Sequence, residues 1–326
     1  MGLDVVPFEG LFVEPAALLL AGAHPPAGEA RSALDLSDVD ASRRLVAAWQ
    51  GTGPAVAAVD DGTLVGFMSA TLEEGFGHQH SRIRMHQHAS VQRGQREVYR
   101  RLYASLADRL TAMGGFEHTI AVSAAHSGVI TSLFELGFGI DQVKGLRPAS
   151  PLIATAERVQ LREAEAGDME DLLRLTVELQ QFHAGTPNLR PALADLRSIQ
   201  DGFRTAFIDE RRLLLVAEEH GRLTGMMQAG PDPRYRSTAT VGMAVVTASA
   251  RSKGVGTALL SGVLSWAADQ GFATCGTEWS SANLVSDAFS RGHGFTPVGY
   301  KLTRLIDARV SWAHTHLNYR YRFPKS

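Results

Sequence analysis

A glycine-rich run, Arg251 to Ala258, most constrains what this chain can fold into. It follows a stretch with strand character, Thr240 to Val246, and precedes one with helix character, Leu259 to Ala268. Because Gly254 and Gly256 carry no side chain, the backbone can turn tightly and approach a ligand closely. The N–H groups at the start of the helix can then converge on an anion, assisted by the helix dipole. The run is therefore predicted to hold a pyrophosphate.

Three phosphate-binding patterns can be compared with this run. A P-loop needs Gly-x-x-x-x-Gly-Lys-Ser/Thr, which the sequence does not contain. A dinucleotide fingerprint needs a third glycine where Leu259 stands. The pattern Arg/Gln-x-x-Gly-x-Gly/Ala is matched by Arg251, Gly254 and Gly256. This run resembles the acyl-CoA pyrophosphate loop of the GNAT superfamily of N-acyltransferases.

A second segment strengthens the resemblance. After a strand-like stretch from Phe272 to Trp279, Asn283 opens a short helix-like run that ends in Gly294-Phe295. The Asn283 side chain can cap a helix and still offer an amide to a pantetheine arm. The glycine suits a left-handed helix terminus, after which the phenylalanine enters the next strand. In this order and spacing, the match resembles two GNAT signatures over roughly residues 237–306.

Composition limits the function classes. The 326 residues suffice for two domains, and 44% apolar content supports sizeable cores. A net charge of −2 predicts no general attraction to nucleic acid or to an anionic membrane. The single cysteine, Cys275, excludes an internal disulfide framework and a cysteine-based zinc site. Residues 1–21 contain no Lys or Arg, so they do not read as a secretion signal, and a cytoplasmic location is expected.

The chain repeats one plan. Gly62 and Gly221, each in a turn between two apolar stretches, lie 159 positions apart, and the Gly-Phe pairs at 137 and 294 lie 157 apart. These offsets predict a duplication with its boundary near residues 148–156. The predicted domains are 1–150 and 157–310, followed by an aromatic tail, 311–326, that would pack across the domains or at a homodimer contact.

Each half is expected to be α/β (α+β): helix, hairpin, strand, helix, strand, helix, strand. In the second half, residues 168–182 have the apolar spacing of an amphipathic helix, and 213–218 with 223–229 read as a hairpin. Residues 238–246 read as the central strand. Two tandem GNAT-like domains follow, each a mixed, mainly antiparallel twisted sheet flanked by helices.

The first half lacks the loop. With Arg93 aligned on Arg251, the two glycine positions fall on Arg96 and Val98, and the position of Asn283 falls on His126. Side chains at the glycine positions would keep a phosphate away. The first half is therefore predicted to be a degenerate GNAT copy without acetyl-CoA.

The resemblance implies acetyl-CoA as co-substrate. Its pyrophosphate would meet the N–H groups of 252–257, and its pantetheine would run along the backbone of 244–246, with the Val245 N–H at the thioester carbonyl. The cofactor-binding residues implied are Ala244, Val245, Val246, Arg251, Ser252, Lys253, Gly254, Val255, Gly256, Thr257, Asn283, Ser286 and Phe289.

The acid and the base are harder to place. Many family members carry a tyrosine where this chain has Ser290, a poor proton donor, although a thiol with a pKa of roughly 8.5 can leave as thiolate with only a hydrogen bond. Tyr300 is another candidate hydroxyl. Residues 237–250 contain no Asp or Glu, so Glu278 is the first candidate base and His183 the second. Trp279 and Phe182 are candidates for the wall of the acceptor pocket. Packing in the hydrophobic core would explain these two aromatic residues equally well.

Four histidines in the first half, His78, His80, His86 and His88, alternate as they would on one face of a strand, which makes a metal site conceivable. No carboxylate is positioned beside them in that pattern, so no metal is predicted.

Taken with the resemblance, the sequence predicts an N-acetyltransferase that acts on a small-molecule amine or a peptide by direct attack in a ternary complex. A non-catalytic acyl-CoA-binding regulator or sensor is the alternative.

Overall fold

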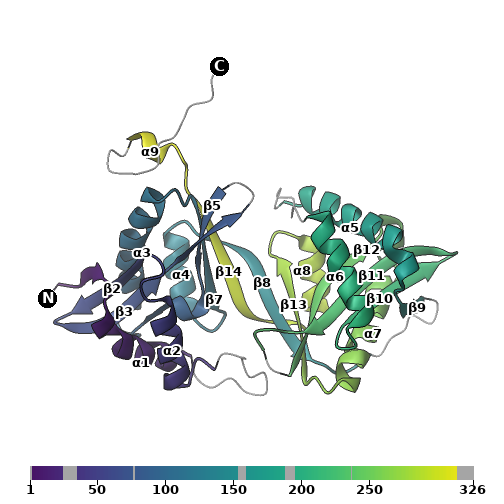
Figure 1. The fold of residues 1–326 in the computed structure, drawn as a ribbon, viewed down its shortest axis with the longest axis horizontal. Helices are drawn as coiled ribbons and strands as arrows, with labels where there is room; N and C mark the ends of the chain where they lie inside the picture. Colours follow the sequence, from purple (N-terminus) through teal and green to yellow (C-terminus); the bar gives the residue numbers. More distant parts are fainter. Residues whose placement is uncertain are drawn as a thin grey trace. The chain divides into compact units, whose positions relative to one another are not determined.

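The computed structural model describes residues 2–24, 35–75, 78–152, 159–187, 195–235 and 237–313. They form two compact units (Figure 1). Of the described residues, unit 1 contains those up to Gln142 and those from Val298, and unit 2 contains Val143–Pro297.

Unit 1 is built mainly from the first half of the sequence. Its elements are β1 (Asp4–Pro7), α1 (Val13–Ala23), α2 (Val39–Trp49), β2 (Ala55–Asp60), β3 (Thr63–Ser69), β4 (Thr71–Gly75), β5 (His78–Ile83), β6 (His88–Ser90), α3 (Gln95–Ala112), β7 (Glu117–Ser123), α4 (Ser127–Glu135), the start of β8 (Gly139–Pro148) and α9 (Val310–Ala313). The strand orders are β1-β2-β3-β6 and β4-β5-β7-β14. The main core lies between these strands, α3 and α4, and a second one packs α1 and α2 on β2 and β3.

Unit 2 contains the predicted acyl-CoA loop. Its elements are the rest of β8, β9 (Gln160–Glu163), α5 (Met169–Ala184), α6 (Leu196–Ile208), β10 (Leu213–Glu219), β11 (Arg222–Pro231), β12 (Thr238–Val246), α7 (Val255–Asp269), β13 (Thr274–Ser280), α8 (Leu284–Gly292) and the start of β14 (Thr296–Leu305). The strand order is β8-β13-β12-β11-β10-β9. Only β12 and β13 among its described pairings run parallel, so the sheet is mixed and mainly antiparallel, as predicted.

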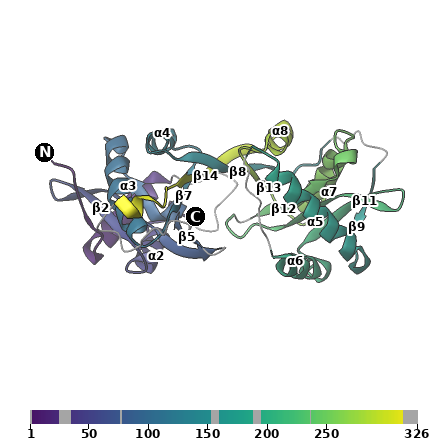
Figure 2. The same cartoon turned by 90° about the horizontal axis from the view of Figure 1, so that it is seen from above.

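Helices cover both faces of the unit 2 sheet (Figure 2). On one face, α5 and α6 bury Leu172, Leu175 and Phe203 against apolar side chains of β10, β11 and β12. On the other, Gly262 of α7 lies so close to Leu215 that an added Cβ would stand 2.5 Å from its Cδ2 atom. The β10–β11 hairpin was predicted, whereas α6 and β9 were not specified from the sequence.

Both hairpins at the repeated glycines have the same turn. His220 and Gly221 have φ of 52° and 73°, and Asp61 and Gly62 have φ of 47° and 78°. Two consecutive residues with positive φ are typical of the tight turns that join antiparallel strands. The repeat at Gly62 and Gly221 is therefore a structural repeat.

The two units do not follow the sequence halves, because the last strand of each half crosses into the other unit. β8 begins in unit 1 and ends in unit 2, and β14 begins in unit 2 and ends in unit 1. There Leu302 pairs with Ile120 of β7 and is fully buried. The ranges 1–150 and 157–310 thus differ from the compact units, since strand pairing joins residues that are distant in sequence. Of the predicted tail, Ser311–Ala313 lie in α9, and 314–326 lie outside the described residues.

The four histidines of the first half do not share a strand face. His80 lies on β5, His86 in a short 3-10 helix (Met85–Gln87) and His88 on β6, and β5 and β6 belong to different strand orders. His88 is buried and bonded through both ring nitrogens, to Tyr99 Oη at 2.7 Å and to the Ala121 carbonyl at 2.8 Å. Of His78 only the backbone is described. Within the described residues, no group of three or more His, Cys, Asp or Glu side chains could hold a metal ion.

Candidate acyl-CoA site

The central strand of unit 2 parts from its neighbour. β12 and β13 pair in parallel from Thr238↔Thr274 to Val241↔Thr277, and no described pairing continues beyond that point. On its other edge β12 stays paired with β11 as far as Gly225↔Val246, after a bulge between Met227↔Ala244 and Ala229↔Val241. Residues 242–246 therefore keep one edge turned away from a strand partner. A fork between two strands with free backbone groups is what the sequence comparison predicted here.

The register of this ladder shows which N–H groups face the fork. The Thr247 N–H donates to the Thr224 carbonyl at 2.9 Å. Hydrogen-bonded pairs recur every second residue in an antiparallel ladder, so the Val245 N–H points to Met226 on β11. The N–H groups of Ala244 and Val246 then face the fork. The Val245 N–H, expected at the thioester carbonyl, is therefore directed to β11, whereas the N–H of the exposed residue Ala244 faces the fork.

The glycine-rich loop has the conformation that an anion site needs. Ser252 has φ of 59° and Gly254 has φ of 83°, and Gly254 is the N-cap of α7. The first intrahelical bond runs from the Ala258 N–H to the Gly254 carbonyl at 2.9 Å. The N–H groups of 255–257 come before that bond and have no acceptor within the helix. They present a positive helix end to the loop.

A cavity of about 440 Å³ joins this loop to the free edge of β12. Its wall contains most of the predicted cofactor residues: Ala244, Val245, Val246, Arg251, Ser252, Gly254, Gly256, Thr257, Asn283, Ser286 and Phe289. The described wall also contains His183, but it does not include Lys253, Val255, Glu278 or Ser290. Val255 is instead buried beneath the loop, where its Cγ1 atom packs against Gly225. The structure thus brings together residues from four segments that are far apart in sequence.

Helix α8 closes one side of the cavity. Asn283 caps it, because its Oδ1 accepts from the Ser286 N–H at 3.1 Å, as predicted. Phe289 lies against Gly256, where an added Cβ would stand 3.2 Å from the ring. His293 Nδ1 contacts the Phe289 carbonyl at 2.7 Å and so must donate, which leaves Nε2 to accept from the Thr257 hydroxyl at 3.0 Å. This contact fixes Thr257 in the first turn of α7.

Arg251 braces the site. Its Nε donates to the Val246 carbonyl at 3.0 Å, and its guanidinium lies 4.3 Å from the centre of the Phe182 ring. A second link, from the Ala248 N–H to Glu178 Oε1 at 2.9 Å, also joins this turn to α5. The first residue of the motif therefore ties the end of α5 to the end of β12. Its role in the wall is at least partly structural.

The candidate bases lie in different surroundings. His183 is in the last turn of α5 and lines the cavity, and burial lowers its pKa below the ordinary value. Its imidazole is therefore neutral near pH 7 and can accept a proton. Glu278 lies outside the described wall, is 39% exposed, and forms ion pairs with Arg234 and, at 4.0 Å, with Lys144.

The candidate acids do not reach the cavity. Ser290 is 4% exposed on α8 and lies outside the described wall. Tyr300 pairs with Val122 in unit 1, because β14 crosses into that unit. Trp279 is buried and donates to Asp287 Oδ1 at 2.8 Å, so it packs the base of α8, whereas Phe182 does line the cavity.

Several wall residues were missed in the sequence. They are apolar: Leu179, Met226, Met227 and Val285. Met226 and Met227 pair with Val245 and Ala244 across the ladder, so the fork places them at the wall. Their position depends on strand register, which a single sequence does not reveal. Leu179 carried a signal, since it lies four residues before His183 on the same helix.

Unit 1 has a counterpart of the loop, with a register different from the one predicted. Gly94 has φ of 73° and is the N-cap of α3, as Gly254 is of α7. The alignment of Arg93 with Arg251 is therefore wrong by two positions: the first glycine is retained as Gly94, and only the second is replaced, by Arg96. A left-handed N-cap favours glycine, which both units have at this position. The Arg96 side chain pairs with Glu135.

The unit 1 counterpart is nearly filled. His126 is the N-cap of α4, which matches the position of Asn283, and its Nε2 donates to the Ala23 carbonyl at 2.8 Å. The end of α1 and the rings of His24, His88 and His126 surround a cavity of only about 10 Å³. That is room for about one water molecule.

Comparison with known proteins agrees with this geometry. Residues 177–295 match the sequence profile of the acetyltransferase (GNAT) family. This segment is therefore similar to the GNAT domains that the profile describes. The match supports acyl transfer as its general chemistry. A search of curated proteins by sequence found no match.

Solved structures resemble the whole chain. A GCN5-related N-acetyltransferase from Sphaerobacter thermophilus has a TM-score of 0.56 at 14% identity, covering 93% of this chain and 95% of that chain. A tandem GNAT protein from the clavulanic acid biosynthesis pathway, solved without AcCoA, has a TM-score of 0.53 at 16% identity, covering 93% and 98%. At these identities the likeness shows the fold: two GNAT-like folds in tandem. In the described part of the chain, no helix is both long and apolar enough to cross a membrane.

Proposed function

We propose that the GNAT domain transfers an acetyl group from acetyl-CoA to a primary amine of a small molecule or peptide. The observation that carries the proposal is the continuous cavity from the N-terminal end of α7 to the free edge of β12. One end offers backbone N–H groups to phosphates, and the other offers the backbone of a strand to an amide-bearing chain. Both features suit the two ends of acyl-CoA.

The chemistry follows from the groups at the fork. The pyrophosphate binds to the loop and the first turn of α7, and the pantetheine lies along residues 244–246. The Ala244 N–H donates to the thioester oxygen, on which negative charge develops as the amine attacks. Asn283 and Ser286 border the path of the pantetheine.

Proton transfer is assigned to His183. Its imidazole lines the cavity and is kept neutral by burial, so it accepts the proton of the attacking nitrogen. Ser290 and Glu278 are not required at this step. A thiol with a pKa of about 8.5 leaves as thiolate and takes its proton from water.

The proposed role of unit 1 is structural. Its counterpart cavity holds about one water, and Arg96 replaces the second glycine of the loop. Acetyl-CoA is therefore expected in unit 2 alone, at one molecule per chain.

A second candidate is a non-catalytic acyl-CoA sensor. It is favoured by one observation: Ser290, which stands where family members carry tyrosine, is buried outside the cavity wall. Thiol release from acetyl-CoA, measured with a panel of primary amines, distinguishes the two. Turnover that is lost in Gly256→Val and slowed in His183→Gln supports the enzyme. Tight binding of acetyl-CoA without turnover on any amine supports the sensor.

A further inference from the structure

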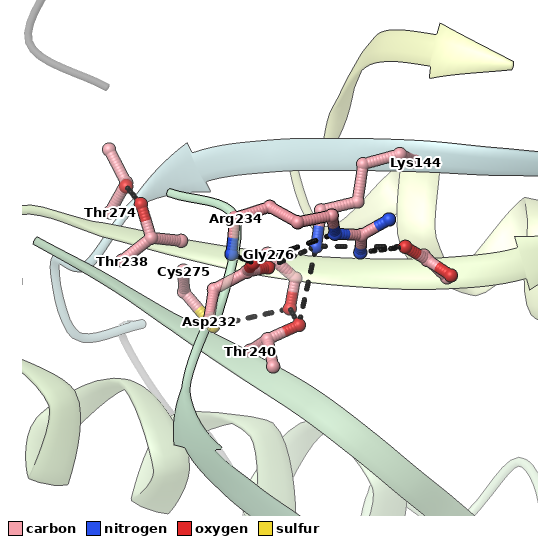
Figure 3. Close-up of polar contacts among 9 residues, drawn as sticks. Lys144, Asp232, Arg234, Thr238, Thr240, Thr274, Cys275 and Gly276 are labelled. Atoms are coloured by element: carbon pink, nitrogen blue, oxygen red, sulfur yellow. Dashed lines mark hydrogen bonds and ion pairs between the residues drawn. The ribbon is translucent and has the colours of Figure 1, made fainter. Parts of the chain in front are cut away.

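Four charged residues meet on the unit 2 sheet beside the fork, and Figure 3 labels three of them, Lys144, Asp232 and Arg234. This fork cluster consists of Lys144 on β8, Asp232 and Arg234 after β11, and Glu278 on β13. Lys144 Nζ lies 2.5 Å from Asp232 Oδ2 and 3.4 Å from the Thr240 hydroxyl. Arg234 forms an ion pair with Glu278, and its backbone N–H donates to Asp232 Oδ1 at 2.8 Å. Two cations therefore face two anions.

The inner pair, Lys144 and Asp232, is buried. The Lys144 and Asp232 side chains are 8% and 0% exposed. Burial raises the pKa of Asp232, but the hydrogen bond and charge of Lys144 outweigh it and hold that pKa below its ordinary value. A buried pair contributes little net stability, although the loss of one partner is costly. Here the pair fixes the turn that carries Arg234.

The outer pair is more exposed, although Arg234 Nε also lies 3.7 Å from Asp232 Oδ1. Arg234 and Glu278 are 55% and 39% exposed. An ion pair of this exposure contributes about 0–1 kcal/mol, because water solvates both charges once they separate. A ligand that offers one charge to each residue can therefore replace their mutual contact at small cost.

The fork cluster reaches the point where β12 and β13 part, although its four residues are not among those that line the described cavity wall. Glu278 directly follows Thr277, the last residue of β13 that pairs with β12. The cluster also lies on the sheet face opposite α7. Lys144 Nζ is 3.0 Å from where a Cβ on Gly276 would stand, whereas Ala239, a neighbour of Thr240 on β12, packs with Ala267 of α7. This is the face that α5 and α6 cover farther along the sheet.

We propose that Arg234 and Glu278 bind an acceptor that carries a carboxylate close to its primary amine, as a free amino acid does. This inference rests on the proposed function and names its substrate class. The planar guanidinium matches a carboxylate with two parallel hydrogen bonds, and Glu278 binds the ammonium. The fork cluster has no net charge, so it favours a ligand with one charge of each sign over a polyamine or a simple anion.

The group transfer balances with these residues. The ammonium held by Glu278 loses one proton to solvent, and the free amine nitrogen forms a bond to the acetyl carbon. The carbon–sulfur bond breaks, His183 takes the second proton from nitrogen, and the coenzyme A thiolate takes a proton from water. Arg234 keeps the carboxylate bound throughout.

The test compares matched acceptors by thiol release. Free amino acids are assayed beside their methyl esters and the corresponding amines without a carboxylate. We expect kcat/KM for the preferred amino acid to exceed that for its ester and amine by at least about 10-fold, equivalent to about 1.4 kcal/mol. In Arg234→Gln this preference should disappear, and Arg234→Lys should restore only part of it. Arg204→Gln, which opens an exposed ion pair with Asp201 on α6, is the matched control and should keep the preference.

Equal rates with amino acids and esters, or a preference that survives in Arg234→Gln, would overturn the inference and leave the proposed function intact. Absence of turnover on every amine would refute the proposed function instead. In that case, calorimetry of amino acids and esters against the protein saturated with coenzyme A decides the inference. Binding of the acid alone, lost in Arg234→Gln, would support it, and equal or absent binding would overturn it.

Discussion

Replacing Gly256 with valine should weaken acyl-CoA binding in a protein that still folds. An added Cβ would stand 3.2 Å from Phe289 Cε2 and 3.8 Å from Val246 Cγ2, among residues that line the cavity. The two methyl groups of valine extend farther than this Cβ, so the Phe289 ring must move, and overpacking of this kind costs about 1–3 kcal/mol. We therefore expect the free energy of unfolding to fall by about 1–3 kcal/mol.

Binding should weaken beyond any effect on folding. The matched pattern accepts glycine or alanine at this position, so the test uses the larger valine, whose methyl groups keep a phosphate oxygen away from the first N–H groups of α7. A hydrogen bond to a charged group contributes about 1.5–3 kcal/mol. The Kd for coenzyme A, measured by isothermal titration calorimetry on the folded variant, should then rise about 10- to 100-fold. Gly202→Val is the matched control, because Gly202 lies inside α6 and no described atom lies within 4 Å of an added Cβ. An unchanged Kd in Gly256→Val, with normal folding, would refute the assignment of this loop to the pyrophosphate.

Three further changes test other parts of the site. Arg251→Gln removes the contact with Phe182 and should lower kcat severalfold, with a smaller effect on KM for acetyl-CoA and partial recovery in Arg251→Lys; equal loss in both parameters would point to direct cofactor contact instead. Burial lowers the pKa of His183, so its imidazole stays neutral at pH values somewhat below the ordinary pKa of histidine. We therefore expect kcat/KM to stay high through neutral pH and to fall as the pH drops through that lowered pKa. A pH–rate profile that is unchanged in His183→Gln would exclude His183 as the base. Lys144→Met leaves Asp232 buried without its main partner and should lower the free energy of unfolding in urea by about 3 kcal/mol. The double variant Lys144→Met with Asp232→Leu should lose less, and equal losses in the two variants would contradict the pairing.

Much of unit 2 could be predicted from local sequence. The bounds of β12 agree with the expected strand, Asn283 caps α8, and most predicted loop residues line the cavity. These features depend on glycine conformation, side-chain capping and apolar alternation, all of which act within a few residues. Such signals are visible in one sequence.

The predictions that were wrong concern the domain bounds, the register of the unit 1 loop and the place of Tyr300, and most of them depend on pairing between distant segments. The crossing of β8 and β14 follows from strand partners more than a hundred residues away, so the halves looked self-contained. The register of the unit 1 loop was misplaced because Arg93 matched Arg251 in type, whereas the backbone aligns Gly94 with Gly254. Tyr300 was considered a candidate hydroxyl for unit 2 because it lies in the second half of the sequence. It lies on β14, which pairs with β7 in unit 1.

Side-chain roles were also limited by what a single sequence shows. Arg251 was assigned to the cofactor, and it lines the cavity while also contacting the Val246 carbonyl and the Phe182 ring. Glu278 was the first candidate base, yet it pairs with Arg234 at the fork cluster while His183 lines the cavity. Glu278 and His183 can both accept a proton, so choosing between them as the base requires their positions in the structure.

A crystal structure of the full chain soaked with coenzyme A tests the central claim most directly. One molecule per chain should lie in unit 2, with its pyrophosphate against the N–H groups of residues 252–257 and its pantetheine along 244–246. Nucleotide density in unit 1, or density in unit 2 that leaves the loop before α7 untouched, would contradict the account.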